Sequence, residues 1–162
     1  MVEIQRLQQQ VVLIPQIAQL GYADWGYQTP EPVIDFLHST LVAAVPCTAV
    51  AMHANQLAGS ISLLEHEMGT QQPAERRYWL GFLVVDPRFR GQGIGRKLMA
   101  YMQQHAMQLG IEQVYCYTIH QADLYQFLGW TSVEQCQYQG DWVTVMTKRL
   151  VSLSRRLDDV DF

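Results

Sequence analysis

The chain has 162 residues, 49% of them apolar, and its 11 Lys and Arg against 15 Asp and Glu give a formal net charge of −4 at pH 7. This length and apolar content are enough to bury the core of one domain, which excludes an intrinsically disordered chain. Proteins that bind nucleic acid or acidic membrane surfaces usually carry a basic face, so we expect neither partner.

Hydrophobic patterning predicts one mixed α/β domain over residues 1–150. Alternating or continuous apolar runs predict strands, and apolar residues at helical spacing predict helices. The expected strands are residues 2–7, 48–54, 57–64, 78–85, 113–118, 131–138 and 142–149. The expected helices are residues 11–20, 30–41, 94–109 and 121–128, and residues 151–162 are an extension of unknown structure.

The strongest pattern lies in the centre of the chain. Residues 78–85 (YWLGFLVV) form a continuous apolar run, which is typical of a strand buried on both faces. The helix at 94–109 and the strand at 113–118 follow it. A strand, a crossover helix and a second strand predict a parallel, right-handed unit, and the paired strands on either side predict hairpins.

Cysteine and histidine usage indicates a reducing compartment and no metal site. Cys47, Cys116 and Cys136 are widely spaced in apolar or strand-like stretches, a pattern typical of buried free thiols. The histidines lack the spacing of metal ligands, so we expect no metal. Neither a signal peptide nor a stretch of the about 20 apolar residues that cross a bilayer is present. We expect a cytoplasmic protein, either a monomer or a homodimer.

The segment that indicates chemistry connects the central strand to the long helix. It contains Gly91, Gly93 and Gly95 between Arg90 and Arg96. Glycines let a backbone approach a ligand closely, and the free N–H groups of a helix N-terminus attract anions. The segment therefore predicts a phosphate or pyrophosphate site, although a tight turn that needs glycine for its geometry alone is an alternative.

Two other phosphate loops do not fit this segment. A Walker A loop requires Lys and then Ser or Thr after its last glycine, whereas Gly95 is followed by Arg96. In the dinucleotide fingerprint G-x-G-x-x-G, the third glycine would stand one residue later than Gly95 does.

Two motifs resemble the GNAT superfamily of N-acetyltransferases. The stretch Arg90-Gly91-Gln92-Gly93-Ile94-Gly95 resembles the family's acetyl-CoA loop, and residues 123–130 (DLYQFLGW) resemble its later xYxxxGF segment, with Trp130 in place of Phe. Element order agrees from residue 2 to 149. The resemblance implies acetyl-CoA as cosubstrate and a mixed sheet of about six to seven strands flanked by about four helices, splayed at the central parallel pair.

The resemblance also implies which residues hold the cosubstrate. Pantetheine would run along residues 83–85 as an added strand does, and the pyrophosphate would lie on the N–H groups of residues 91–96. The thioester carbonyl would meet an oxyanion-type N–H donor near Val84 or Val85. The implied cofactor-binding residues are Leu83, Val84, Val85, Arg90, Gly91, Gln92, Gly93, Ile94, Gly95, Arg96 and Thr118.

Catalytic roles follow from the same comparison. Tyr125 matches the tyrosine that protonates the departing thiolate, and its ordinary pKa of about 10 keeps the proton available at pH 7; a core tyrosine is the alternative. At the position where many relatives carry a glutamate that acts as the general base, this chain has Gln113, whose amide is not a useful base. His120 is a candidate base acting through water, or else a solvated loop histidine.

The resemblance also implies that the acceptor lies under the connection between the first two helices. There Asp24, Trp25, Tyr27 and Glu31, with the pair Tyr78-Trp79 on the central strand, suit a cation, because aromatic faces and carboxylates both attract one; a packed helix corner is the alternative. We expect direct transfer of acetyl to a primary amine of a small molecule or peptide N-terminus, because no Cys or Ser has a recognisable base partner. A non-catalytic acyl-CoA binding module is the alternative function.

Overall fold

A seven-stranded mixed sheet and four α-helices make up residues 1–150, the part of the chain that this computed structural model describes. The extension expected at residues 151–162 lies outside the described residues. The strands are β1 Val2–Arg6, β2 Cys47–His53, β3 Gln56–Leu64, β4 Trp79–Val85, β5 Gln113–Thr118, β6 Thr131–Tyr138 and β7 Asp141–Arg149. The α-helices are α1 Ile14–Gly21, α2 Glu31–Ser39, α3 Ile94–Gln108 and α4 Ala122–Phe127.

The predicted order of elements is confirmed, and the differences lie at the ends of strands, by one residue, and at the ends of helices. The first helix begins at Ile14, after a 3₁₀ turn at Val11–Leu13, and Pro15 occupies its first turn, where the N–H that proline lacks has no helical partner. The second helix ends at Ser39 and not at residue 41, because the Thr40 hydroxyl donates to the Leu37 carbonyl and closes the last turn.

The sheet opens at its only parallel pair. Strand order is β1-β2-β3-β4-β5-β7-β6, and each neighbouring pair among these described strands is antiparallel except β4 with β5. That pair is joined at Trp79 and Tyr115 and nowhere further along. The β3–β4 register shifts opposite Phe82, whose φ is +49°; such a bulge bends a strand and increases its twist. The predicted splay is therefore confirmed.

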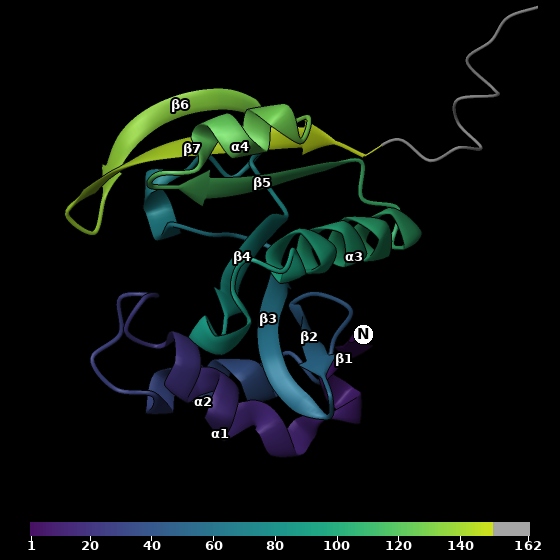
Figure 1. Cartoon of the computed structure of the whole chain (residues 1–162). Coiled ribbons are helices and arrows are strands. Elements are labelled where there is room, and N and C mark those ends of the chain that lie inside the picture. The colour runs from purple at the N-terminus through teal and green to yellow at the C-terminus, as the bar shows by residue number, and fades with distance from the viewer. Residues whose placement is uncertain (151–162) are drawn as a thin grey trace, which may run out of the picture.

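Helices cover both faces of the sheet (Figure 1). Val50 and Leu57 pack against α1 and α2, whereas Ile61 and Leu63 pack against α3 on the opposite face. Leu57 and Ile61 face opposite ways although they are four residues apart, because the β2–β3 register shifts between them and a bulge interrupts the alternation of side chains. The short helix α4 lies on β6 and β7 and joins the same core as α3. This arrangement brings the N-terminus of α3 and one side of α4 to the two edges of the opening.

One prediction for β4 is wrong. The run 78–85 was expected to be buried on both faces, but Gly81, Phe82, Leu83 and Val85 are only partly buried. The reason is the opening itself, because no neighbouring strand covers this edge of β4 beyond Trp79.

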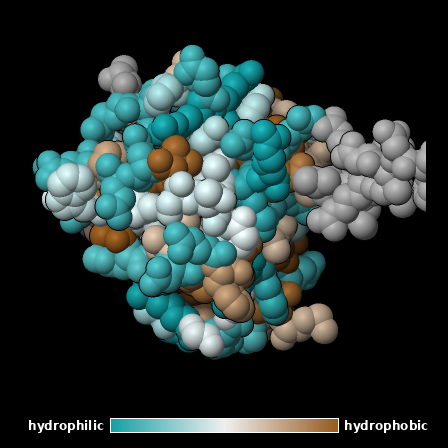
Figure 2. All heavy atoms as spheres, turned by 90° about the horizontal axis from the view of Figure 1, so that it is seen from above, coloured by the Kyte–Doolittle hydropathy of each residue, from teal (hydrophilic) through white to brown (hydrophobic). Residues whose placement is uncertain are grey.

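The remaining features are ordinary for a globular domain. Cys47 and Cys116 are buried free thiols, and Cys136 is a partly buried one. The face seen from above is mostly hydrophilic, with separate hydrophobic patches (Figure 2). Within residues 1–150, no helix combines the length and apolar character of a membrane span.

The packing of α3 gives a test of the core. Leu98 is fully buried between α3 and the sheet, so Leu98→Ala should lower the free energy of unfolding by about 3 kcal/mol. Leu109, just after the same helix, is 40% exposed, and Leu109→Ala should change stability by less than about 1 kcal/mol. Urea unfolding of both variants measures the difference, and equal losses would contradict this packing.

Candidate active site

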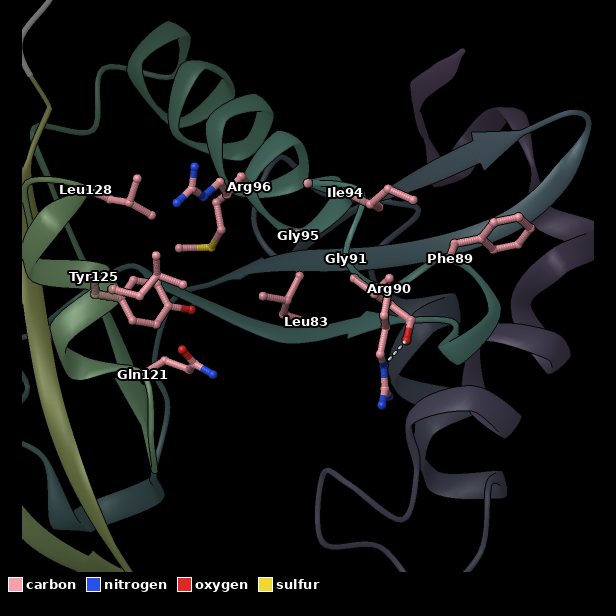
Figure 3. A pocket seen from close by; sticks show the side chains of 14 residues that line it. Leu83, Phe89, Arg90, Gly91, Ile94, Gly95, Arg96, Gln121, Tyr125 and Leu128 are labelled. Carbon is pink, nitrogen blue, oxygen red and sulfur yellow. Dashed lines mark hydrogen bonds between the residues drawn. The ribbon is translucent and has the colours of Figure 1, made fainter.

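A cavity of about 290 Å³ lies between β4, the N-terminus of α3 and α4 (Figure 3). The sequence pointed to both sides of it, since the glycine segment forms one wall and the side of α4 that carries Tyr125 forms the other. Its residues are Leu83, Val85, Phe89, Arg90, Gly91, Gly93, Ile94, Gly95, Arg96, Met99, Gln121, Leu124, Tyr125 and Leu128.

The glycine wall has the shape of an anion site. Gly91 and Gly93 have φ of +80° and +77°, a conformation that side chains rarely adopt, and a Cβ built at either would meet nothing within 4 Å. Gly93 is the N-cap of α3, with no side-chain cap and no acidic residue in the first turn. The first N–H groups of the helix are thus available to a ligand, and Arg96 lies beside them.

The open edge of β4 presents backbone groups to the cavity. The Asp86 N–H donates to the Ala58 carbonyl of β3, and because such groups alternate in direction along a strand, the N–H and carbonyl of Val85 point away from β3, toward the opening. The carbonyls of Leu83 and Val85 accept hydrogen bonds from Trp25 Nε1 (3.3 Å) and Arg90 Nε (3.1 Å). Each carbonyl oxygen has a second lone pair for a ligand.

Tyr125 reaches from α4 across the cavity toward Leu83 (Figure 3). Its ring packs edge-on against Trp130, with 5.7 Å between ring centroids. Burial, with a smaller contribution from Cys116, raises the pKa of Tyr125 to about 12. Burial also raises the pKa of the Cys116 thiol to about 12, so anions of both kinds are disfavoured in this part of the core.

Four residues predicted for the site lie outside the cavity lining. Val84 is buried, with its side chain on the other face of β4, and Gln92 is exposed. The Thr118 hydroxyl accepts from the Gln121 N–H and so begins the turn into α4. His120 is exposed in that turn, in agreement with the alternative of a solvated histidine.

A second, narrower cavity of about 50 Å³ lies beside the same stretch of β4. Rings form most of its wall: Phe82 packs against Trp25 (5.0 Å between centroids), Tyr27 (6.5 Å) and Phe36 (4.5 Å). Its residues are Trp25, Tyr27, Glu67, Phe82, Tyr117, Tyr138 and Gln139. A wider cavity of about 360 Å³, which shares Tyr117, Tyr138 and Gln139 and includes Asp24 and Asp141, adjoins it.

The first cavity and the narrow one border the same stretch of β4, where it is not paired with β5. Leu83 lines the first and its neighbour Phe82 lines the second, and β5 contributes Tyr117 beyond its last contact with β4. In the described part of the chain, no hydrogen-bond ladder joins the two strands there, so paired backbone does not separate the two faces of the sheet at this point.

Of the residues predicted for an acceptor, Trp25 and Tyr27 line the narrow cavity and Asp24 lines the wider one. Glu31 is exposed in the first turn of α2 and lines neither. Trp79 is completely buried, with its indole N–H bonded to the Arg76 carbonyl. Tyr78 packs into the core under α3. Both lie apart from these cavities, because the strand begins in the paired half of the sheet.

Glu67 is the functional candidate that the sequence did not reveal. It lies in the loop before β4, in a stretch with no motif, and its carboxyl group enters the narrow cavity. Burial raises the pKa of Glu67 to about 7, although the Met68 N–H bonded to the carboxyl lowers it in part. Phe82, Tyr117 and Tyr138 were likewise absent from the predicted site.

Comparison with known proteins agrees with this geometry. The model of the acetyltransferase (GNAT) family matches residues 14–130. An aminoglycoside 6'-N-acetyltransferase solved with coenzyme A is similar in structure, with a TM-score of 0.73 at 16% identity, covering 93% of this chain and 98% of that one. The yncA protein of Salmonella typhimurium, solved with acetyl-CoA, gives 0.72 at 14% identity over 94% and 95%.

The aminoglycoside 6'-N-acetyltransferase of Enterococcus faecium gives a TM-score of 0.69 at 17% identity, over 93% of this chain and 98% of that one. At sequence identities this low, the similarity to these structures shows a shared fold and no more. Among curated protein sequences, no match to the chain was found.

The start of the glycine wall depends on Asp86. The residue is only 5% exposed, and its carboxylate accepts from the Arg88 N–H (2.9 Å) and pairs with the Arg88 guanidinium (3.0 Å). This Arg88 side-chain hydrogen bond is the main reason why the pKa of Asp86 is lowered. Asp86 is the N-cap of a 3₁₀ turn, Pro87–Phe89, that leads into the glycines.

Asp86→Ala should therefore lower the free energy of unfolding by about 1 kcal/mol at pH 7. Because the pKa of Asp86 is lower in the folded chain, its stabilisation is complete above the unfolded value of about 4 and is lost as pH falls through the folded value. Urea unfolding from pH 7 to pH 2 should show the difference between variant and wild type shrinking. A difference independent of pH would contradict this role.

Proposed function

Because this chain belongs to the acetyltransferase (GNAT) family, we propose that it transfers the acetyl group of acetyl-CoA directly to a primary amine. The observation that supports this most strongly is the pair of cavities on opposite faces of the unpaired β4–β5 stretch, one with an anion-binding helix end and the other with aromatic walls. In this proposal, residues 1–150 are one catalytic domain.

The first cavity suits acetyl-CoA. Room above Gly91 and Gly93, together with the free N–H groups at the start of α3, accommodates the pyrophosphate. The apolar side chains of Leu83, Val85 and Leu128 flank a channel for pantetheine, which would bond to the open edge of β4 in the manner of an added strand. The cosubstrate supplies the activated acyl group, and the chain's own residues orient it.

The second cavity suits a cationic acceptor with an apolar body, because ring faces attract a cation and Glu67 offers a carboxyl group. The acceptor nitrogen must lose a proton before it attacks the thioester carbon. As the new C–N bond forms, negative charge develops on the carbonyl oxygen. The Val85 N–H, which faces the opening, is the donor that stabilises this charge.

Transfer is direct in this proposal because, in the part of the chain that the structure describes, neither cavity lining includes a cysteine or a serine. After the attack the nitrogen loses a second proton, the C–S bond breaks, and the leaving sulfur takes the proton of the Tyr125 hydroxyl. Tyr125 regains a proton from water. Two protons leave the nitrogen and one reaches sulfur, so each turnover releases one proton to solvent.

The pKa of Tyr125 is compatible with this role. At about 12 it keeps the hydroxyl protonated throughout the physiological range, as a general acid requires. A thiol ordinarily has a pKa of about 8.5, so proton transfer from the Tyr125 hydroxyl to a thiolate would be unfavourable in water. Burial raises the pKa of the neighbouring Cys116 thiol to a similar value, and a leaving thiolate in the same surroundings becomes a correspondingly stronger base.

Gly93→Glu tests the cosubstrate site. A carboxylate at the N-cap of α3 would repel the pyrophosphate, so CoA affinity should fall at least about 10-fold, or about 1.4 kcal/mol. Gly110→Glu is a matched control, because Gly110 also has positive φ (+81°) and open space but lies beyond the other end of α3. Calorimetry with CoA should separate the two, and unchanged affinity in folded Gly93→Glu would remove the basis of the proposal.

Tyr125→Phe tests the general acid. The ring remains and only the hydroxyl is lost, so stability and CoA affinity should change little while turnover falls by about 10²-fold. Tyr101→Phe, on the partly buried side of α3, is the control. Thiol release with a panel of primary amines gives the measurement. If Tyr125→Phe keeps near-normal turnover, Tyr125 is a packing residue.

A further inference from the structure

Among the described residues, Glu67 is the only acidic one that lines the narrow aromatic cavity. We propose that Glu67 binds the ammonium group of an unbranched primary alkylamine and accepts its proton, and so acts as the base of the reaction. This inference rests on the proposed function and narrows its acceptor to a terminal –CH₂–NH₃⁺ group.

The position of Glu67 depends on a glycine in the neighbouring strand. A Cβ at Gly81 would lie 2.5 Å from Glu67 Oε2 and 3.0 Å from Leu64 Cδ1. Gly81 is not among the residues with positive φ, so glycine is needed here for space. The missing side chain lets the carboxyl group lie against β4, one residue before Phe82, where the sheet begins to open.

The cavity walls determine which amines can reach this carboxyl group. Trp25, Tyr27, Phe82, Tyr117 and Tyr138 surround it, and Tyr117 and Tyr138 meet edge to face, with 5.4 Å between centroids. Ring faces of this kind attract a cation. A volume of about 50 Å³ holds only a few groups the size of water. We therefore expect the narrow cavity to admit a methylene with its ammonium and to exclude a carbon that branches next to the nitrogen.

The charges around Glu67 suit a base. From the elements packed around it, the titratable groups that face it are Tyr27 in the α1–α2 connection, Tyr117 on β5 and Tyr138 on β6. Burial raises the pKa of Tyr117 and of Tyr138 above the ordinary value, so neither of these two is an anion near pH 7. Within residues 1–150, no lysine, arginine or histidine lines the cavity. On its own loop, Glu65 pairs with Arg77 at the surface and His66 is exposed.

An incoming ammonium group would therefore supply the positive charge that is missing from the cavity lining around Glu67. With a pKa of about 7, Glu67 is ionised in much of the population at neutral pH and can still accept a proton. The other candidates are placed less well, since the Gln113 amide donates to the Thr147 hydroxyl and His120 lies outside both cavities. The N–H bond of the ammonium breaks, its proton goes to a Glu67 oxygen, and the electron pair left on nitrogen attacks the thioester carbon.

The direct test is titration of Glu67 by ¹³C NMR of the side-chain carboxyl groups, with E67Q to assign the signal. We expect a midpoint near 7. Saturating n-butylammonium should lower it by about one pH unit, a 10-fold change in proton affinity, because a bound cation favours the carboxylate. The branched isomer sec-butylammonium should leave it unchanged. A midpoint near 4, or equal shifts with both isomers, would overturn the inference.

Stability gives a readout that needs no acceptor. Because the pKa of Glu67 is raised in the folded chain, ionising it opposes folding. The unfolding temperature of E67Q should exceed that of wild type by an amount that grows from about pH 4 to about pH 7 and is constant above pH 7. E65Q, two residues away at the surface, should show no such gain. If E67Q and E65Q behave alike, Glu67 is not desolvated and the inference fails.

Activity completes the test, with n-butylamine as the probe and N-butylacetamide detected by mass spectrometry. Wild type should form this product with a rate that rises through about pH 7. E67Q should form at least about 10²-fold less while binding CoA as wild type does. Gly81→Ala, which displaces the tip of a flexible side chain, should lower product formation and stay folded, and E65Q should match wild type.

The outcomes separate this inference from the proposed function. If CoA binds and branched or secondary amines are acetylated while n-butylamine is not, the chain is an N-acetyltransferase and the role given to Glu67 is wrong. Full activity of E67Q with n-butylamine also overturns that role. If CoA itself does not bind to wild type, the proposed function fails first.

Discussion

The site exists because β4 stops pairing with β5 after Trp79. That break depends on the bulge at Phe82, whose φ of +49° is unusual for an aromatic residue and costs on the order of 1–2 kcal/mol. Packing offsets this cost, because Phe82 lies against Phe36, Trp25 and Tyr27. The Trp25 indole also donates to the carbonyl of the next residue, Leu83. The same contacts that hold the strand open also build the wall of the narrow cavity.

The double role of these contacts, which hold β4 open and line the narrow cavity, explains what the N-terminal helices do. α1 and α2 have 8 and 9 residues, which is too short for stability in isolation. Their buried residues, such as Ile17 and Leu37, dock on β2 and β3. The connection between them then carries Trp25 and Tyr27 to β4, so a change in that loop would alter the backbone that faces the cosubstrate as well as the acceptor.

Prediction from the sequence succeeded where the signal is local. Helix and strand order followed from periodicity, and the glycine segment and Tyr125 followed from two short motifs whose spacing matches a family; both line one cavity. The acceptor side could not be read in this way. Nothing in the sequence distinguishes the aromatic residue that packs in the core, Trp79, from the one that lines the cavity, Trp25. Glu67 lies in a loop without pattern, and only the empty space beside Gly81 brings its carboxyl group to the opening.

The electrostatics of the two faces differ from what the net charge implies. A chain of net charge −4 would repel a polyphosphate if charge were uniform, but binding depends on local groups. The first turn of α3 has no acidic residue, and Arg90 and Arg96 line the cavity into which its N-terminus opens. On the opposite face, Glu67 lines the narrow cavity and two more carboxylates, Asp24 and Asp141, line the adjoining one. An anionic donor and a cationic acceptor are each attracted to their own face and repelled from the other. In the proposed reaction, the neutral acyl group and the reacting nitrogen are then the parts that meet at the break in the sheet. There the Val85 N–H and the buried Tyr125 hydroxyl would lie beside the charge that the reaction generates.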